Sequence, residues 1–287
     1  MRAFRDDVPR WPALAGVAAL LGGALIAALA PLAAALPALT VDAHRTTPAV
    51  VLLGAALGSA GMVALVVRLA RLTRPVTAAQ LGLRVPNTLS RAVLVTAGAA
   101  LALAVLAAAW RALGDPREAL SIPPELDTRS LTAQAYDLPV REPVAFGPAL
   151  LASALARCVL PVVAAEILVR GFAFPALSEW RGPAVSAVIV SVLFGGLVPV
   201  TGVAAMSMLL GVALCALYLA TGSLLPGVTL ASVVAAAGLG MACALTVGQI
   251  AALAVLCGAA AFGLAIPASA SRSSSSLLAK VRRSAPA

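Results

Sequence analysis

Apolar residues run in long blocks along this chain, and polar residues are largely confined to the stretches between them. The blocks are about 20 residues long, the length that an α-helix needs to cross a ~30 Å hydrocarbon core. There are eight, at roughly 13–36, 49–67, 92–110, 149–178, 183–203, 205–221, 223–243 and 248–267. The pattern predicts an all-α fold, a polytopic bundle of about eight transmembrane helices.

Composition agrees with a membrane protein, since 62% of the residues are hydrophobic and only 11% are charged. A soluble domain carries about 25% charged residues. The net charge of +9 comes from scattered basic residues that are not interleaved with aromatic ones, which argues against a nucleic-acid partner. Membrane lipid is the expected partner. The scarcity of lysine beside abundant alanine, arginine, glycine and leucine points to a bacterial source.

Basic residues near the ends of the blocks predict the orientation, because cytoplasmic loops carry an excess of them. They gather in the N-terminal tail, the second loop and the C-terminal tail: Arg2, Arg5 and Arg10; Arg68, Arg71, Arg74, Arg84 and Arg91; Arg272, Lys280, Arg282 and Arg283. Eight spans place all three segments on one side. We therefore expect a multi-pass protein of the cell membrane with both termini cytoplasmic. Trp11, Trp110 and Trp180 fall at the predicted membrane boundaries and are expected to anchor there.

Three regions follow from this pattern. Residues 1–146 hold three spans and an external loop at 111–146. Residues 147–267 form the membrane core, and residues 268–287 form a basic, serine-rich cytoplasmic tail.

Glu166 and Arg170 stand inside the fourth apolar block. A charged residue at the centre of a membrane helix costs about 2.5–3.5 kcal/mol on insertion scales, so such residues mark functional or structural sites. Their i,i+4 spacing, with the glutamate on the N-terminal side, favours an ion pair on one helical face. We expect this pair to be buried and to tie the helix to its neighbours.

Four short segments carry a family resemblance. They are Ala165-Glu-Ile-Leu-Val-Arg-Gly-Phe172, Phe194-Gly-Gly-Leu-Val198, Tyr218-Leu-Ala-Thr-Gly-Ser-Leu-Leu-Pro226 and Ser232-Val-Val-Ala-Ala236. In order and spacing they resemble the CPBP intramembrane proteases, which include the CAAX prenyl proteases of the Rce1 type and Abi-like relatives. The resemblance implies a CAAX-protease-like core of helices around an intramembrane endopeptidase site.

The catalytic positions of that family are mostly replaced here. Its motif has a first glutamate where this chain has Ala165, and histidines where it has Val198 and Ser232. Its asparagine corresponds to Ala236. Glu166 and Arg170 remain, and the resemblance gives them a catalytic role. At 1.5 Å per residue, Glu166, Val198 and Ser232 lie roughly 18, 22 and 14 Å from the cytoplasmic face, so their helices bring them to similar depth.

The chemistry of peptide hydrolysis needs an acid or base and donors that stabilise a charged intermediate. A catalytic zinc needs three protein ligands and an open position. This chain offers one carboxylate at membrane depth and no imidazole there, because its only histidine, His44, lies in the first external loop. We therefore predict no metal and no cofactor.

Three functions stay open. The favoured hypothesis is a catalytically inactive relative of these proteases that binds a membrane protein or peptide in the former substrate groove. The alternatives are an active but divergent endopeptidase of the CAAX-processing type, and a transporter or channel component.

Overall fold

The computed structural model describes residues 11–35, 48–72, 77–86, 88–112, 147–197, 204–243 and 245–265. Every regular element within these ranges is a helix, which confirms the predicted all-α class. His44, residues 113–146 of the predicted external loop and the tail at 268–287 lie outside the described residues. The proposed division at residue 146 falls there too and stays a prediction.

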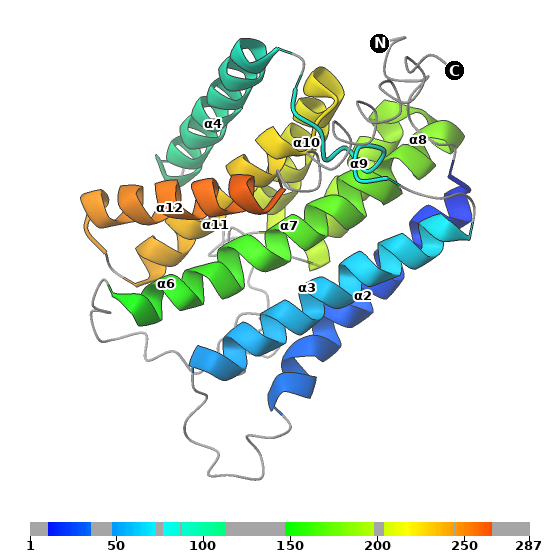
Figure 1. The fold of residues 1–287 in the computed structure, drawn as a ribbon. Helices are drawn as coiled ribbons and strands as arrows, with labels where there is room; N and C mark the ends of the chain where they lie inside the picture. Colours follow the sequence, from blue (N-terminus) through cyan, green and yellow to red (C-terminus); the bar gives the residue numbers. More distant parts are fainter. Residues whose placement is uncertain are drawn as a thin grey trace, which may run out of the picture.

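A long central helix organises the bundle and runs through its middle in Figure 1. Its five consecutive parts are α6 (Pro148–Ala154), η3 (Leu155–Val159), α7 (Leu160–Glu166), η4 (Ile167–Ala173) and α8 (Phe174–Arg181). The parts η3 and η4 are π-helical, and a proline follows each one, Pro161 and Pro175. Because proline has no N–H for the i−4 carbonyl, it interrupts the regular ladder, and one wider turn accommodates the break.

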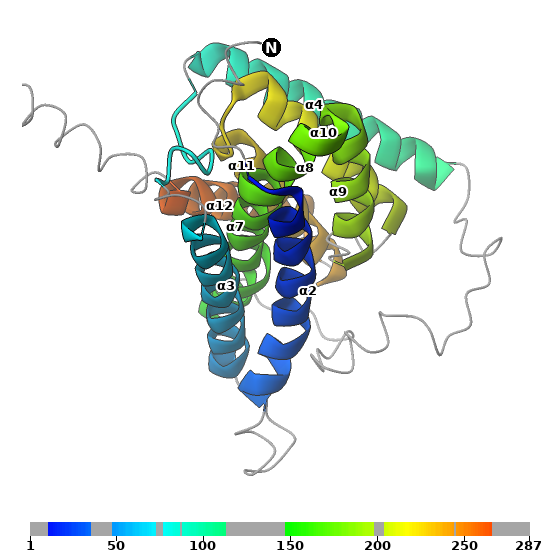
Figure 2. The ribbon, with the colours of Figure 1, turned by 90° about the vertical axis from the view of Figure 1, so that its right-hand side faces the viewer.

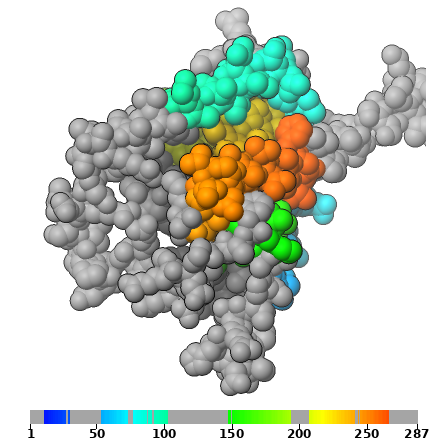
Figure 3. All heavy atoms as spheres, turned by 90° about the vertical axis from the view of Figure 1, so that its left-hand side faces the viewer, coloured from blue at the N-terminus to red at the C-terminus, as the bar shows by residue number. Residues whose placement is uncertain are grey.

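The other helices pack around this axis. Helices α2 (Ala13–Ala35) and α3 (Pro48–Arg71) lie side by side along one flank of it, as Figure 2 shows. Helix α9 (Pro183–Leu197) pairs with α10 (Ala204–Thr221), and α11 (Leu225–Ala242) pairs with α12 (Val247–Ala265). Helix α4 (Leu89–Ala112) rests on α10 and α11. On the face seen in Figure 3, α12 lies between α4 and the first turns of the central helix.

Three stretches of helix are long and apolar enough to cross a membrane, judged by length and composition alone: Leu53–Arg71, Leu150–Arg181 and Val247–Ala265. Shorter apolar helices occupy the other predicted blocks. Large apolar side chains such as Leu14, Leu94 and Val255 point away from the bundle, as lipid-facing residues do. A membrane helical bundle is thus confirmed, while the number of spans and their orientation stay predictions.

Trp180 and Trp11 differ in their exposure. Trp180 is 57% exposed at the end of α8, with the Arg181 guanidinium 4.2 Å from the centre of its ring, as suits an anchor at a membrane surface. Trp11 is only 2% exposed and packs on Phe172, with ring centroids 4.9 Å apart. The anchoring prediction is wrong for Trp11, because its ring fills a gap inside the bundle. The side chain of Trp110 lies outside the described residues.

Candidate functional site

The two charged residues of the fourth apolar block sit where the central helix changes geometry. Glu166 is the last residue of α7, and Arg170 lies within η4. Their side chains are 1% and 0% exposed. The wider π turn begins directly after Glu166, next to Gly211 of α10 and Gly227 of α11.

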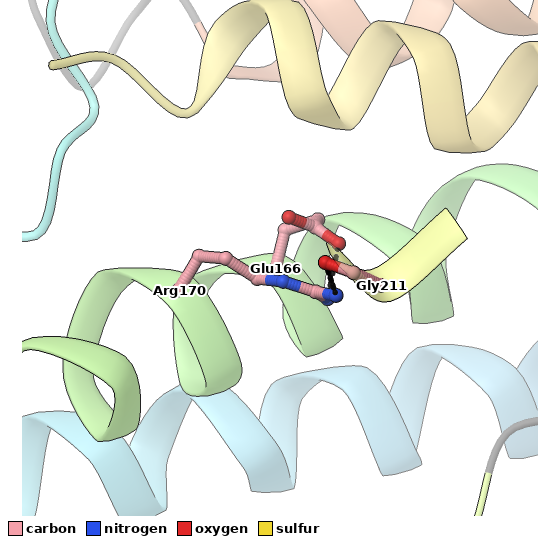
Figure 4. A network of polar contacts seen from close by, with 3 residues as sticks. All are labelled: Glu166, Arg170 and Gly211. Atoms are coloured by element: carbon pink, nitrogen blue, oxygen red, sulfur yellow. Dashed lines mark hydrogen bonds and ion pairs between the residues drawn. The ribbon is translucent and has the colours of Figure 1, made fainter. Parts of the chain in front are cut away.

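Glu166 and Arg170 form the buried ion pair expected from their spacing. The Arg170 Nη1 donates to the Glu166 Oε1 over 2.7 Å. The Arg170 Nη2 also donates to the backbone carbonyl of Gly211 on α10, over 3.3 Å (Figure 4). The guanidinium therefore joins the central helix to α10. Such charge-assisted bonds compensate for part of the cost of removing both charges from water.

Close packing of α9 and α10 places the Gly211 carbonyl. A Cβ atom built on Gly211 would lie 2.9 Å from the Cβ of Ser191 and 3.0 Å from its Oγ. Real Cβ atoms essentially never come so near, so only glycine permits this approach. One turn along α10, the buried Cys215 thiol lies within interaction range of Arg170, Glu166 and Ser191. A small polar cluster thus surrounds the guanidinium.

The second oxygen of the Glu166 carboxylate is turned toward α11. A Cβ built on Gly227 would lie 3.5 Å from the Glu166 Oε2, in ordinary van der Waals contact. The ion pair is therefore enclosed between α10, through Gly211, and α11, through Gly227.

The positions that the resemblance aligns with the family's catalytic residues can be followed in part. Ala165 is 6% exposed on α7, and Ser232 and Ala236 on α11 are 0% exposed. The central helix contacts both α9 and α11. Within the described residues the Ser232 hydroxyl has no hydrogen-bond partner. Val198 lies outside the described residues.

The residues present do not fit a metal ion. Within the described ranges, no three His, Cys, Asp or Glu side chains lie close enough together to hold one. Glu166 is already bound to Arg170, and Cys158, Cys215, Cys243 and Cys257 are separate thiols, not paired in disulfides. Zinc chemistry would need three donors around an open position, which these ranges do not provide.

Sequence analysis missed a segment that docks beside this cluster, residues 77–86, which we call the strap. Along the chain the strap connects α3 to α4, and in the fold it contacts the turn that joins α10 to α11. Arg84 Nε donates to the Gly222 carbonyl over 2.7 Å, and the Leu224 N–H donates to the Gly82 carbonyl over 2.8 Å. The Ser223 hydroxyl donates to the Arg84 carbonyl. The one local signal in the sequence is Thr77-x-x-Gln80, whose Gln80 Oε1 accepts the Thr77 N–H over 3.0 Å.

Residues 147–237 match the family model described as type II CAAX prenyl endopeptidase, Rce1-like. The match confirms the resemblance for this segment, which is less than half of the chain. No curated protein and no solved structure matches the chain. We call residues 147–237 the Rce1-like segment.

The Rce1-like segment contains the central helix, α9, α10 and most of α11. The ion pair, Gly211, Gly227 and the turn at 221–225 all lie inside it. The strap, α2, α3, α4 and α12 lie outside it, yet the strap and α2 and α3 cover the same stretch of the central helix. The chain is thus a membrane protein whose Rce1-like segment packs against helices beyond the family match.

Proposed function

We propose that the Rce1-like segment does not hydrolyse peptides, and that it binds an apolar chain, such as a membrane segment or a lipid-modified peptide. The observation that carries this proposal is the burial of Glu166 and its pairing with Arg170. Glu166 is the one buried carboxylate among the described residues, and its Oε1 is held by Arg170 at 2.7 Å. The Arg170 guanidinium therefore occupies one of the two oxygens that could accept a proton from water.

The positions beside Glu166 support the same conclusion. Hydrolysis of an amide needs a group that takes up and returns a proton, and donors for the developing oxyanion. Ala165 and Ala236 carry neither, and the Ser232 hydroxyl has no hydrogen-bond partner within the described residues. Losing several catalytic groups together removes their joint effect, because such groups act as a unit.

Small, apolar side chains favour binding over chemistry here. Ala165, Gly227 and Ala236 offer no charge and little bulk on the elements that face one another around the ion pair. An apolar chain that packs there needs no polar partner. In lipid, close helix contacts through small residues are a common basis of association.

The test combines turnover and capture on the purified full-length protein in nanodiscs. A fluorogenic farnesylated CAAX peptide should not be cleaved. The same peptide carrying a photoreactive diazirine on its prenyl chain should crosslink to η4, α10 or α11, as mapped by mass spectrometry. Gly227→Leu should abolish the crosslink, because the added side chain projects toward Glu166 and Leu214.

Gly263→Leu is the matched control, since a Cβ built on Gly263 meets nothing within 4 Å. It should leave the crosslink unchanged. Turnover that disappears in Glu166→Ala would restore the protease hypothesis. Equal crosslinking of parent and Gly227→Leu would reject binding at this place.

A further inference from the structure

The strap is held by the Rce1-like segment through both side-chain and backbone bonds. Arg84 forms a two-way contact, because its Nε donates to the Gly222 carbonyl while its own carbonyl accepts from the Ser223 hydroxyl. The Gly82 carbonyl adds the bond from the Leu224 N–H. Leu81 and Leu83, on either side of Gly82, are each 6% exposed. The strap therefore buries apolar side chains while its polar groups bond to the turn.

Two glycines with left-handed backbone make this fit possible. Gly82 has a φ of +80°, and a Cβ there would lie 2.8 Å from the Tyr218 ring. Gly222 has a φ of +64°, and a Cβ there would lie 2.8 Å from Arg84 Nη2. Both positions need glycine for backbone conformation and for space. The docked arrangement therefore depends on a glycine in the strap, Gly82, and on a glycine in the turn, Gly222.

The strap also touches the central helix next to the ion pair. A Cβ built on Gly171, the residue after Arg170, would lie 2.7 Å from the Leu81 carbonyl. It would also lie 3.3 Å from Leu224, which immediately precedes α11. The strap thus covers the place where η4, the end of α10 and the start of α11 meet. Its course beside α10 can be followed in cyan in Figure 1.

We propose that the strap is a lid built into the chain: while docked on the 222–224 turn it closes this end of the Rce1-like segment, and its release admits a ligand to the Glu166–Arg170 site. This inference rests on the proposed binding function. Residues 77–86 form no helix, and one of the docking bonds comes from Arg84, which is only half-buried. Irregular segments held through half-exposed side chains belong to the parts of a protein that open locally without global unfolding.

The strap belongs to the same chain as the turn on which it docks, so it is present at high effective concentration. A ligand that enters from this end must first displace the strap from the 222–224 turn. The lid would therefore raise the ligand concentration needed for binding without changing any residue that contacts the ion pair.

A native cysteine reports on opening. Cys215 is fully buried beside Arg170, whereas Cys158 and Cys257 are buried on η3 and α12, outside the α10–α11 turn that the strap contacts. The full-length protein in nanodiscs is treated with N-ethylmaleimide, and alkylation of each cysteine is followed by mass spectrometry. Arg84→Ala should speed alkylation of Cys215 by ~10-fold or more, since a charge-assisted bond that holds the lid is lost. Cys158 and Cys257 should not change.

Arg71→Ala is the matched control, because it removes an exposed arginine at the end of α3 and should leave all rates unchanged. If Arg84→Ala does not fold, Ser223→Ala removes the other side-chain bond to the strap. An unchanged Cys215 rate would overturn the lid. Alkylation of all three cysteines rising together would also overturn it, because that result indicates general loosening. Alkylation needs no ligand, so failure of the lid and failure of the binding function are distinguished by separate assays.

Discussion

Neutralising one member of the buried ion pair is the most direct test of how the Rce1-like segment is held together. Glu166→Gln keeps the size of the side chain and an oxygen that can accept from Arg170 Nη1. It removes the negative charge and leaves the guanidinium in a site that is 0% exposed. Its bond to the Gly211 carbonyl is long, at 3.3 Å, and a neutral carbonyl does not replace the lost negative charge.

Breaking a buried pair by removing one partner costs about 3–5 kcal/mol, because the other charge is stranded. The retained amide oxygen places Glu166→Gln at the lower end of that range, and Glu166→Ala at the upper end. With 2–4 °C per kcal/mol for chains somewhat shorter than this one, the melting temperature should fall by ~6–12 °C for Glu166→Gln.

Thermal unfolding of the purified protein in nanodiscs, followed by light scattering or intrinsic fluorescence, measures this change. Glu179→Gln is the control, since it neutralises an exposed carboxylate on α8. Adding Arg170→Met to Glu166→Gln should recover part of the loss, because an apolar side chain of similar length replaces the stranded charge.

If Glu166→Gln and Arg170→Met each melt at the temperature of the parent, the ion pair does not stabilise the fold. If the double variant loses the sum of the two single effects, the two side chains do not interact energetically. Either result contradicts the prediction.

Three further outcomes are expected. Gly211→Ala should lower the melting temperature by several degrees, because the new Cβ would meet Ser191 at 2.9 Å, while Gly98→Ala, which meets nothing within 4 Å, should not. Metal analysis of the purified protein should find zinc well below one ion per chain, since the described residues lack a ligand set. Ser130→Cys and Ser275→Cys should be labelled by an impermeant maleimide from opposite sides of the membrane, and labelling from the same side would contradict the predicted topology.

The helices were predictable because a membrane leaves few choices. Backbone groups in lipid must bond within the segment, so each apolar block becomes a helix. The predicted blocks at 13–36 and 248–267 coincide closely with Ala13–Ala35 and Val247–Ala265. The ion pair was predictable for the same kind of reason, since an i,i+4 spacing alone brings the two groups onto one face.

Tertiary contacts between distant segments could not be predicted from the sequence pattern. Arg84 of the strap lies 138 residues before its partner Gly222 in the sequence. The strap is also too short and irregular to carry a periodic signal. The prediction that Trp11 anchors at the membrane surface was wrong for a similar reason. An aromatic residue near a predicted boundary can equally well pack inside the bundle. The π turns were missed because Pro161 and Pro175 signal a break in a helix without saying how it is absorbed.

The residues that carry the family resemblance are largely those with structural contacts in this protein. Arg170 holds Glu166 and the Gly211 carbonyl, Gly171 lets the strap approach, and the Gly222-Ser223-Leu224 turn binds the strap directly. None of these contacts requires the family's catalytic groups, which the resemblance aligns with Ala165 and Ala236. A chain can therefore keep the framework of an endopeptidase for reasons of packing alone. Recognition of that framework identifies the fold of the segment, and only the groups around Glu166 bear on its chemistry.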